Sequence, residues 1–180
     1  MMMACEPKLL IADEPTTALD VTIQSQIVEL MKDLRKTKGT AILLITHDIG
    51  LVAEMCEKVG VMYAGSIVEQ GTIAEILNSP RMPYTIGLMH SIPRIGDTRD
   101  ALPIIPGQVP DPINLPSGCK FHPRCPFADA KCVSEYPPTV DLGGGHMASC
   151  HHLDKTTEMS EVQDAFDRFV EELESKGGEV

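Results

Sequence analysis

The sequence predicts an α/β fold, followed by a loop-rich unit held by cysteines and by an acidic C-terminal helix. Three observations lead to this prediction. Two short apolar runs flank a segment with helical spacing near the start of the chain. Twelve of the 14 prolines and four of the six cysteines fall in a later stretch, and the final segment combines an apolar stripe with many acids. We therefore expect three parts, which comprise residues 1–78, 79–152 and 153–180.

The first part is expected to begin with a βαβ unit. The residues KLLIAD (8–13) are typical of a buried parallel strand, and TAILLIT (40–46) repeats the pattern. Asp20 and Gly39 are residue types that commonly cap the two ends of a helix, so we place a helix between them. A strand, a helix and a second strand in this order are expected to pair the two strands in parallel.

Polar side chains follow both predicted strands at the point where each strand ends. Asp13 and Glu14 close the first apolar run, and His47 follows the second. The carboxyl ends of parallel strands line the ligand crevice of an open α/β sheet. We therefore expect these three side chains to converge.

The remaining elements are predicted from shorter signals. A helix over residues 49–59 should lead into a hairpin over residues 60–71, which turns at Ala64 and Gly65. A brief helix should then end at Pro80, and the prolines that follow disfavour regular helices and central strands. The C-terminal helix carries its apolar stripe on Met159, Val162, Phe166, Phe169 and Leu173.

Composition and charge limit the class of protein. The formal net charge is −11, which argues against nonspecific binding to nucleic acid because that binding needs basic residues. The sequence has no apolar run of eighteen residues or more and no signal-peptide pattern at its start. We expect a globular protein in the cytoplasm.

The acid pair and the histidine lie in strings that point to one family. Four apolar residues followed by Asp and Glu fit the Walker B arrangement, and LLIADEPTTALD (9–20) followed by LLITHD (43–48) resembles the second half of an ATP-binding cassette (ABC) transporter ATPase. The stretches DEPTTALDVTIQSQI and YAGSIVEQGT most resemble the subunits that power oligopeptide and dipeptide uptake. The resemblance implies part of a P-loop nucleotide-hydrolase sheet with flanking helices.

The resemblance also implies roles for individual residues, with ATP and Mg²⁺ as cofactors. Asp13 would hold Mg²⁺ through water, and Glu14 would orient or deprotonate the attacking water. By the same analogy, His47 would contact the γ phosphate. Asp20 would couple two ATP sites across a dimer, although helix capping alone also explains this residue.

The family further implies partners and a location. These are a second ATPase subunit, identical or paralogous, the membrane-spanning permease subunits and, indirectly, a peptide-binding protein. The protein would then lie peripherally on the inner face of the cell membrane. The cargo would be dipeptides or oligopeptides, with nickel as an alternative that close relatives carry.

The phosphate-binding motif that such an ATP site needs does not occur in these 180 residues. No G-x-x-x-x-G-K-[ST] is present, so the backbone amides and the lysine that cradle phosphates are missing. We expect the isolated chain to hydrolyse no ATP and to expose apolar strand edges that favour self-association. The alternative is a noncatalytic metal-binding module or a remnant of such an ATPase.

Four cysteines have a spacing that suggests a metal site. Cys119, Cys125, Cys132 and Cys150 fall as C-x5-C-x6-C-x17-C, which lacks the tight knuckles usual for zinc. Iron–sulfur clusters accept looser spacing. This stretch resembles the C-terminal extension of peptide-uptake ATPases, some of which carry a [4Fe-4S] cluster on matching cysteines, and we therefore favour a structural cluster. Zinc bound with help from His122, His146 or His151 stays open, as do free thiols or disulfides.

Overall fold

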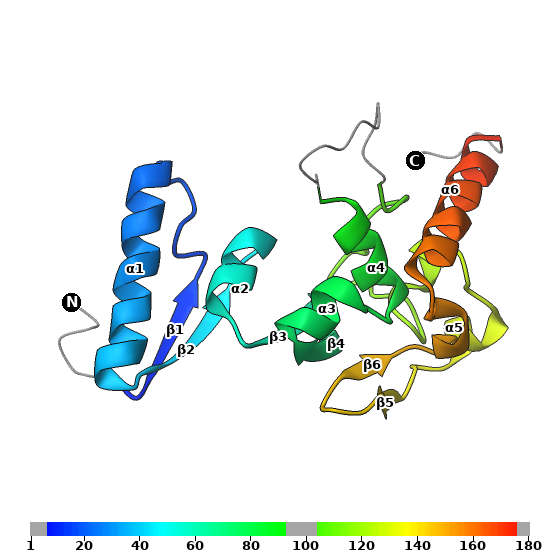
Figure 1. Cartoon of the computed structure of the whole chain (residues 1–180). Helices are drawn as coiled ribbons and strands as arrows, with labels where there is room; N and C mark the ends of the chain where they lie inside the picture. Colours follow the sequence, from blue (N-terminus) through cyan, green and yellow to red (C-terminus); the bar gives the residue numbers. More distant parts are fainter. Residues whose placement is uncertain (1–6, 93–103, 176–180) are drawn as a thin grey trace. The chain divides into compact units, whose positions relative to one another are not determined.

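The chain folds as two compact units in the computed structural model, which describes residues 7–92 and 104–175 (Figure 1). The first unit ends at Glu57, and the second begins at Lys58. This division differs from the boundary expected near residue 78, because the hairpin that starts at Lys58 pairs with a strand from the cysteine-rich part. Each unit has its own hydrophobic core.

The first unit is the βαβ unit that the sequence predicts, followed by a short helix. The two strands pair in parallel, from Leu9 opposite Ala41 to Asp13 opposite Ile45. Its elements are β1 (Leu9–Asp13), α1 (Val21–Lys38), β2 (Ala41–Ile45) and α2 (Ile49–Met55). The last helix is shorter than the predicted 49–59, because a strand begins at Lys58.

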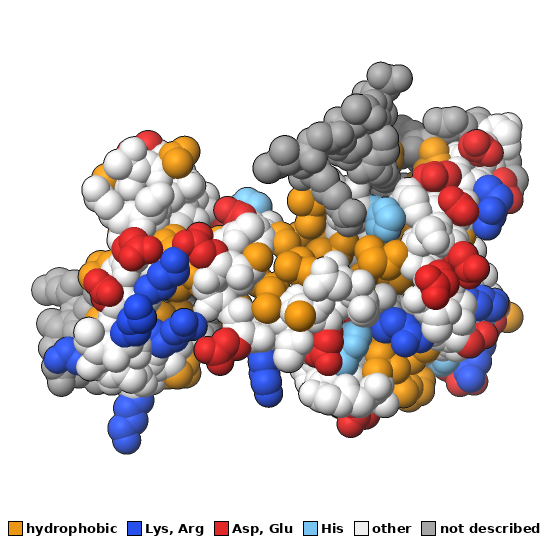
Figure 2. Space-filling view, in the orientation of Figure 1, with side chains coloured by type: hydrophobic (Ala, Val, Ile, Leu, Met, Phe, Trp, Pro, Cys, Tyr) orange, Lys and Arg blue, Asp and Glu red, His pale blue; other side chains and the backbone are white. Residues whose placement is uncertain are grey.

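Both ends of α1 follow from local sequence. The Asp20 carboxylate accepts a hydrogen bond from the backbone N–H of Ile23 at 3.0 Å, which satisfies a donor at the helix start. Gly39 has a φ of 65°, in the left-handed region that ends many helices, and its N–H donates to the carbonyl of Arg35. Figure 2 shows basic and acidic side chains side by side over α1, where Lys32 bonds Glu54 at 2.6 Å.

The two strands of the first unit bury one face and expose the other. The buried face packs on a core of Val28, Met31, Leu51 and Met55. The opposite face carries large apolar side chains that are about half exposed, and we call these four residues the open face. They are Leu9 (53%), Ile11 (56%), Leu43 (49%) and Ile45 (47%).

The second unit is built on a four-stranded antiparallel sheet in the order β3-β4-β6-β5. The predicted hairpin is confirmed, with a turn at Ala64 (φ 45°) and Gly65 (φ 78°). Its strands are β3 (Lys58–Tyr63), β4 (Ser66–Thr72), β5 (Thr139–Asp141) and β6 (Met147–Ser149). Its helices are α3 (Ile73–Asn78), α4 (Pro83–His90), α5 (Ala130–Ser134) and α6 (Met159–Ser175), with 3-10 turns η2 (His122–Arg124) and η3 (Leu153–Thr156).

The sequence analysis expected the prolines to disfavour regular helices in this part of the chain, but the second unit contains them. Pro83 stands at the first position of α4, where the missing N–H costs nothing and the fixed φ favours a helix. The strands β5 and β6 were also not predicted, because each has only three residues. The acidic C-terminal helix is confirmed as α6, which packs against α4 (Figure 1).

The core of the second unit joins the hairpin, the cysteine-rich loops and α6. Phe121, which is 1% exposed, makes an edge contact with Tyr63 and a tilted contact with Phe166. Val162, on the same face of α6 as Phe166, is fully buried. The acidic segment is therefore part of this unit. In the described residues no helix has the length and apolar character needed to cross a membrane.

A buried carboxylate ties three segments of the second unit together. Glu69 of β4 accepts hydrogen bonds from the backbone N–H of Arg81 at 2.7 Å and of Met82 at 2.9 Å. Its Oε1 also lies 2.7 Å from Nε2 of His146, just before β6. Both side chains of this pair are nearly inaccessible to water, so each needs the other as a partner.

The open face predicts self-association of the isolated chain. Substituting Ile11→Thr and Leu43→Thr together should weaken that association by at least about tenfold, because each aliphatic side chain contributes roughly 1.5 kcal/mol or more when buried. Sedimentation velocity across the micromolar range measures the effect. Val21→Thr, on a residue that is 78% exposed outside this face, is the matched control. A wild-type chain that stays monomeric throughout that range contradicts the prediction.

Candidate functional site

The acid pair lies where the sequence places it, at the carboxyl end of β1. The hydrogen-bonding pattern continues one residue past the strand, because the Glu14 N–H donates to the carbonyl of Ile45 at 2.8 Å. Glu14 then turns the chain with a φ of 46°, an uncommon value for a residue other than glycine. Asp13 is exposed at the strand end.

The carboxylate of Glu14 is held by two neighbours. Its Oε1 lies 2.8 Å from Nδ1 of His47 and accepts a second bond from the His47 backbone N–H at 3.2 Å. Its Oε2 accepts a hydrogen bond from the Thr17 hydroxyl at 2.8 Å. The structure therefore brings Glu14 and His47 into direct contact across the ends of β1 and β2, although the imidazole remains 82% exposed.

These contacts favour the charged forms of both groups. The hydrogen bonds from His47 and then from Thr17 lower the pKa of Glu14. The hydrogen bond and the negative charge of Glu14 raise the pKa of His47. An anionic carboxylate beside a proton-bearing imidazole can accept a proton from water while the imidazole donates to an anion.

The loop between β1 and α1 is ordered by bonds to its own backbone. The Thr16 carbonyl accepts from the side-chain amide of Gln24 at 3.2 Å and from the Leu19 N–H at 3.3 Å. Ala18 has a φ of 61° within this loop. At the end of the loop, the Asp20 carboxylate caps α1. This capping bond is a structural role for Asp20 that needs no second subunit.

All four predicted metal ligands lie in the second unit as free thiols. Burial raises the pKa of Cys125, and the neighbouring thiols of Cys150, Cys119 and Cys132 raise it further. Burial also raises the pKa of Cys150 to about 11.

The three histidines considered as zinc ligands have other partners. In each of them one ring nitrogen lies within hydrogen-bond distance of an oxygen atom, which belongs to a backbone carbonyl or to a carboxylate. The contacts join His122 Nδ1 to the Cys119 carbonyl at 2.9 Å, His146 Nε2 to Glu69 at 2.7 Å, and His151 Nε2 to the Glu135 carbonyl at 3.0 Å.

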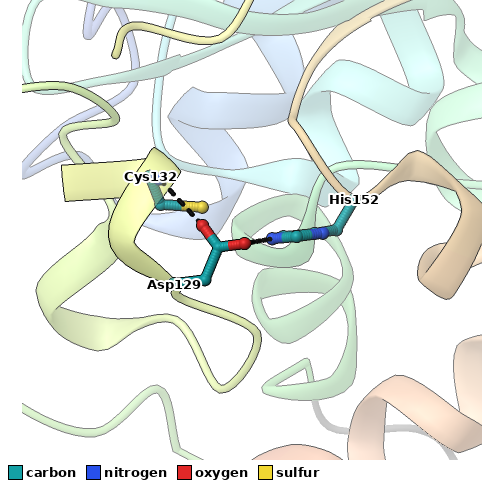
Figure 3. A group of neighbouring side chains, drawn as sticks. All are labelled: Asp129, Cys132 and His152. Carbon is teal, nitrogen blue, oxygen red and sulfur yellow. Dashed lines mark hydrogen bonds and ion pairs between the residues drawn. The ribbon is translucent and has the colours of Figure 1, made fainter. Parts of the chain in front are cut away.

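A different group of ligand-type side chains converges beside one of the cysteines. In the described part of the chain, Asp129, Cys132 and His152 each offer one ligand atom, and these atoms lie within 4.8 Å of one another. Figure 3 shows the three side chains pointing toward one another. The sequence reasoning missed Asp129 and His152, although an aspartate three residues before a cysteine and a His-His pair after another were visible signals.

Two family models match parts of the chain. The family described as the oligopeptide/dipeptide transporter C-terminal region matches residues 68–132. A family described as an AAA domain of the AbiEii toxin, type IV toxin–antitoxin system, matches residues 2–53. The first match covers three of the four clustered cysteines, and the second covers the acid pair and its histidine.

Curated relatives align with most of the chain. The dipeptide transport ATP-binding protein of Escherichia coli is 48% identical over 152 residues, which are 84% of this chain and 46% of that protein. A Brucella ovis protein provisionally named a peptide import ATP-binding protein is 50% identical over 156 residues, 83% of this chain and 46% of the relative. This chain spans slightly less than half the length of these relatives. It is a relative of the ATP-binding subunits of peptide-importing ABC transporters and contains their oligopeptide/dipeptide C-terminal region.

Proposed function

We propose that this chain supplies the hydrolytic half of an ATP site that powers peptide import across a membrane. The observation that carries the proposal is the contact between Glu14 and His47 at the carboxyl ends of two parallel strands. In an open α/β sheet this edge is where ligands bind. The names of the relatives support peptide transport as the process that the hydrolysis drives.

Each residue of the site has a role in this proposal. The anionic Glu14 orients the attacking water and accepts its proton, while Thr17 keeps the carboxylate in place. His47, which carries a proton next to Glu14, donates a hydrogen bond to the transferred phosphoryl group. Asp13 is free to hold Mg²⁺ through water, and the metal would neutralise charge on the phosphates.

The proposed importer also requires a phosphate-binding loop and further subunits. The phosphates must be cradled by a glycine-rich loop, which these 180 residues do not contain. A second ATPase subunit, permease subunits and a peptide-binding protein complete the proposed importer, with the ATPase on the cytoplasmic face of the membrane. Asp20 stands in the loop that would face the second subunit. Dipeptides or oligopeptides are the proposed cargo, and nickel is the alternative.

A second candidate function is metal binding by the cysteine-rich loops. We propose that Cys119, Cys125, Cys132 and Cys150 hold a structural [4Fe-4S] cluster. The presence of four free cysteines in one folded unit favours this function, because a cluster takes four thiolates. The cluster would pin loops that share few regular elements. Zinc on the same residues is the alternative.

The ATPase proposal predicts a clear effect of one substitution. In a polypeptide that joins this chain to an upstream phosphate loop, Glu14→Gln should lower ATP turnover by at least about a hundredfold, because a positioned general base contributes that much. ATP binding should persist. Phosphate release and nucleotide binding measure the two effects, and Glu29→Gln, on an exposed face of α1, is the control. Turnover by the isolated chain that disappears in Glu14→Gln would falsify the requirement for the upstream loop.

The charged pair predicts a pH dependence. The pKa of His47 should lie above its ordinary value of about 6.5 and should fall toward it in Glu14→Gln. The raised pKa of His47 gives stability that is lost as pH rises through the folded value. The lowered pKa of Glu14 gives stability that is lost as pH falls through its own. NMR titration of the histidine rings measures the shift, and an unchanged His47 pKa in Glu14→Gln refutes the pairing.

The cluster proposal predicts the metal content of the protein. Anaerobic purification should yield about four iron and four sulfide per chain. Cys119→Ser should lose most of both, while Cys56→Ser, on a cysteine of the first unit, should retain them. Iron and acid-labile sulfide assays decide the matter. Stoichiometric zinc without sulfide in the wild-type chain counts against the cluster.

A further inference from the structure

Three side chains from two segments of the second unit meet at one point. Asp129 lies in the loop before α5, Cys132 lies in α5, and His152 lies between β6 and η3 (Figure 3). Their ligand atoms are all within 4.8 Å of one another. The group lies beside the predicted cluster and uses only one of its four cysteines.

The donor atoms suit a borderline transition metal. Zinc is bound in proteins by thiolate sulfur, imidazole nitrogen and carboxylate oxygen. In a tetrahedral site with metal–ligand distances of about 2.0 Å, a nitrogen and an oxygen ligand stand about 3.3 Å apart. Oδ2 of Asp129 and Nε2 of His152 are 3.1 Å apart. These two atoms therefore already have the separation of ligands that share one ion.

The only described neighbour that His152 Nε2 contacts as an ion-pair partner is a carboxylate, Asp129. Its Nε2 is buried and lies 3.1 Å from Oδ2 of Asp129, which is an ion pair when the ring is protonated, and it forms no hydrogen bond within the described residues. A buried ring nitrogen that has this contact but no hydrogen bond is incompletely satisfied. An ion placed between Nε2 and Oδ2 would satisfy both atoms.

The Asp129 carboxylate is positioned by a bond that leaves one oxygen available. Its Oδ1 accepts a hydrogen bond from the Cys132 backbone N–H at 2.9 Å and so caps α5. Its Oδ2 faces His152. The same capping bond fixes the start of the helix that carries the Cys132 sulfur. Two ligands are therefore oriented by a single local motif.

We propose that Asp129, Cys132 and His152 form a site for one divalent transition-metal ion of the zinc type. Cys132 is 5% exposed, whereas the Asp129 side chain is 48% exposed, so the ion enters from the side of the carboxylate. The fourth position is open to water. The inference goes beyond the proposed cluster. Because both would use Cys132, one chain holds either the single ion or the cluster.

Cobalt titration of the full chain tests the site. Cluster-free protein, prepared and kept without oxygen, should bind about one Co²⁺ and gain the near-ultraviolet absorption of a thiolate–cobalt bond. His152→Ala and Asp129→Asn should each weaken binding by at least about tenfold, since even outer-sphere partners contribute that much. Asparagine retains the cap on α5, so loss of binding in that variant does not reflect loss of the helix.

Two further variants separate this site from the cluster. Cys119→Ser should bind Co²⁺ like the wild type while losing iron and sulfide, whereas His152→Ala should do the reverse. His151→Ala is the matched control, because its ring bonds a backbone carbonyl instead of the site. Co²⁺ binding that survives His152→Ala but is lost in Cys119→Ser overturns the proposal in favour of a four-cysteine site. An absence of Co²⁺ binding in the wild type also overturns it and leaves the cluster proposal untouched.

Discussion

The parallel pairing of β1 with β2 is the constraint on which the candidate nucleotide site depends. Its register places Asp13 opposite Ile45, and one more backbone bond carries the pairing to Glu14. Because His47 follows two residues after Ile45, the backbone alone brings the carboxylate and the imidazole within reach of each other. The side-chain bonds then select their charged forms, so the geometry of the sheet sets the proton chemistry of the site.

In the second unit, a buried carboxylate connects the segments on which the structure depends. Glu69 links β4 to the start of α4 and to His146 beside β6, and the Glu69 and His146 side chains are almost completely buried. Removing one partner of such a buried pair typically costs about 3–5 kcal/mol. The loops that carry the cysteines are therefore fastened to the sheet through Glu69 and through the aromatic core around Phe121. A metal ion would therefore add stability to a unit whose loops are already held by these contacts.

The first unit could be predicted because its signals are local in the sequence. The second unit could be predicted only in part because it depends on contacts between residues far apart in the sequence. The caps at Asp20 and Gly39 and the two apolar runs act over a few residues, so the βαβ unit and the meeting of Glu14 with His47 followed from the sequence. Glu69 and His146 are 77 residues apart, and no local sequence pattern predicts their pairing or the short strands beside them. The same holds for His152, which reaches Asp129 only after α5 and β6 are placed. Its neighbour His151 was a more natural choice from the sequence, but its ring turns to the Glu135 carbonyl.

The proposed ATP hydrolysis requires that water attacks the γ phosphate beside Glu14. A structure of the Glu14→Gln variant, joined to an upstream phosphate loop and bound to ATP and Mg²⁺, tests it most directly. We expect a water molecule within about 3 Å of the residue 14 side chain, in line with the γ phosphorus, and His47 within hydrogen-bond distance of a γ-phosphate oxygen. A nucleotide bound with these two side chains turned away from its phosphates would contradict the claim.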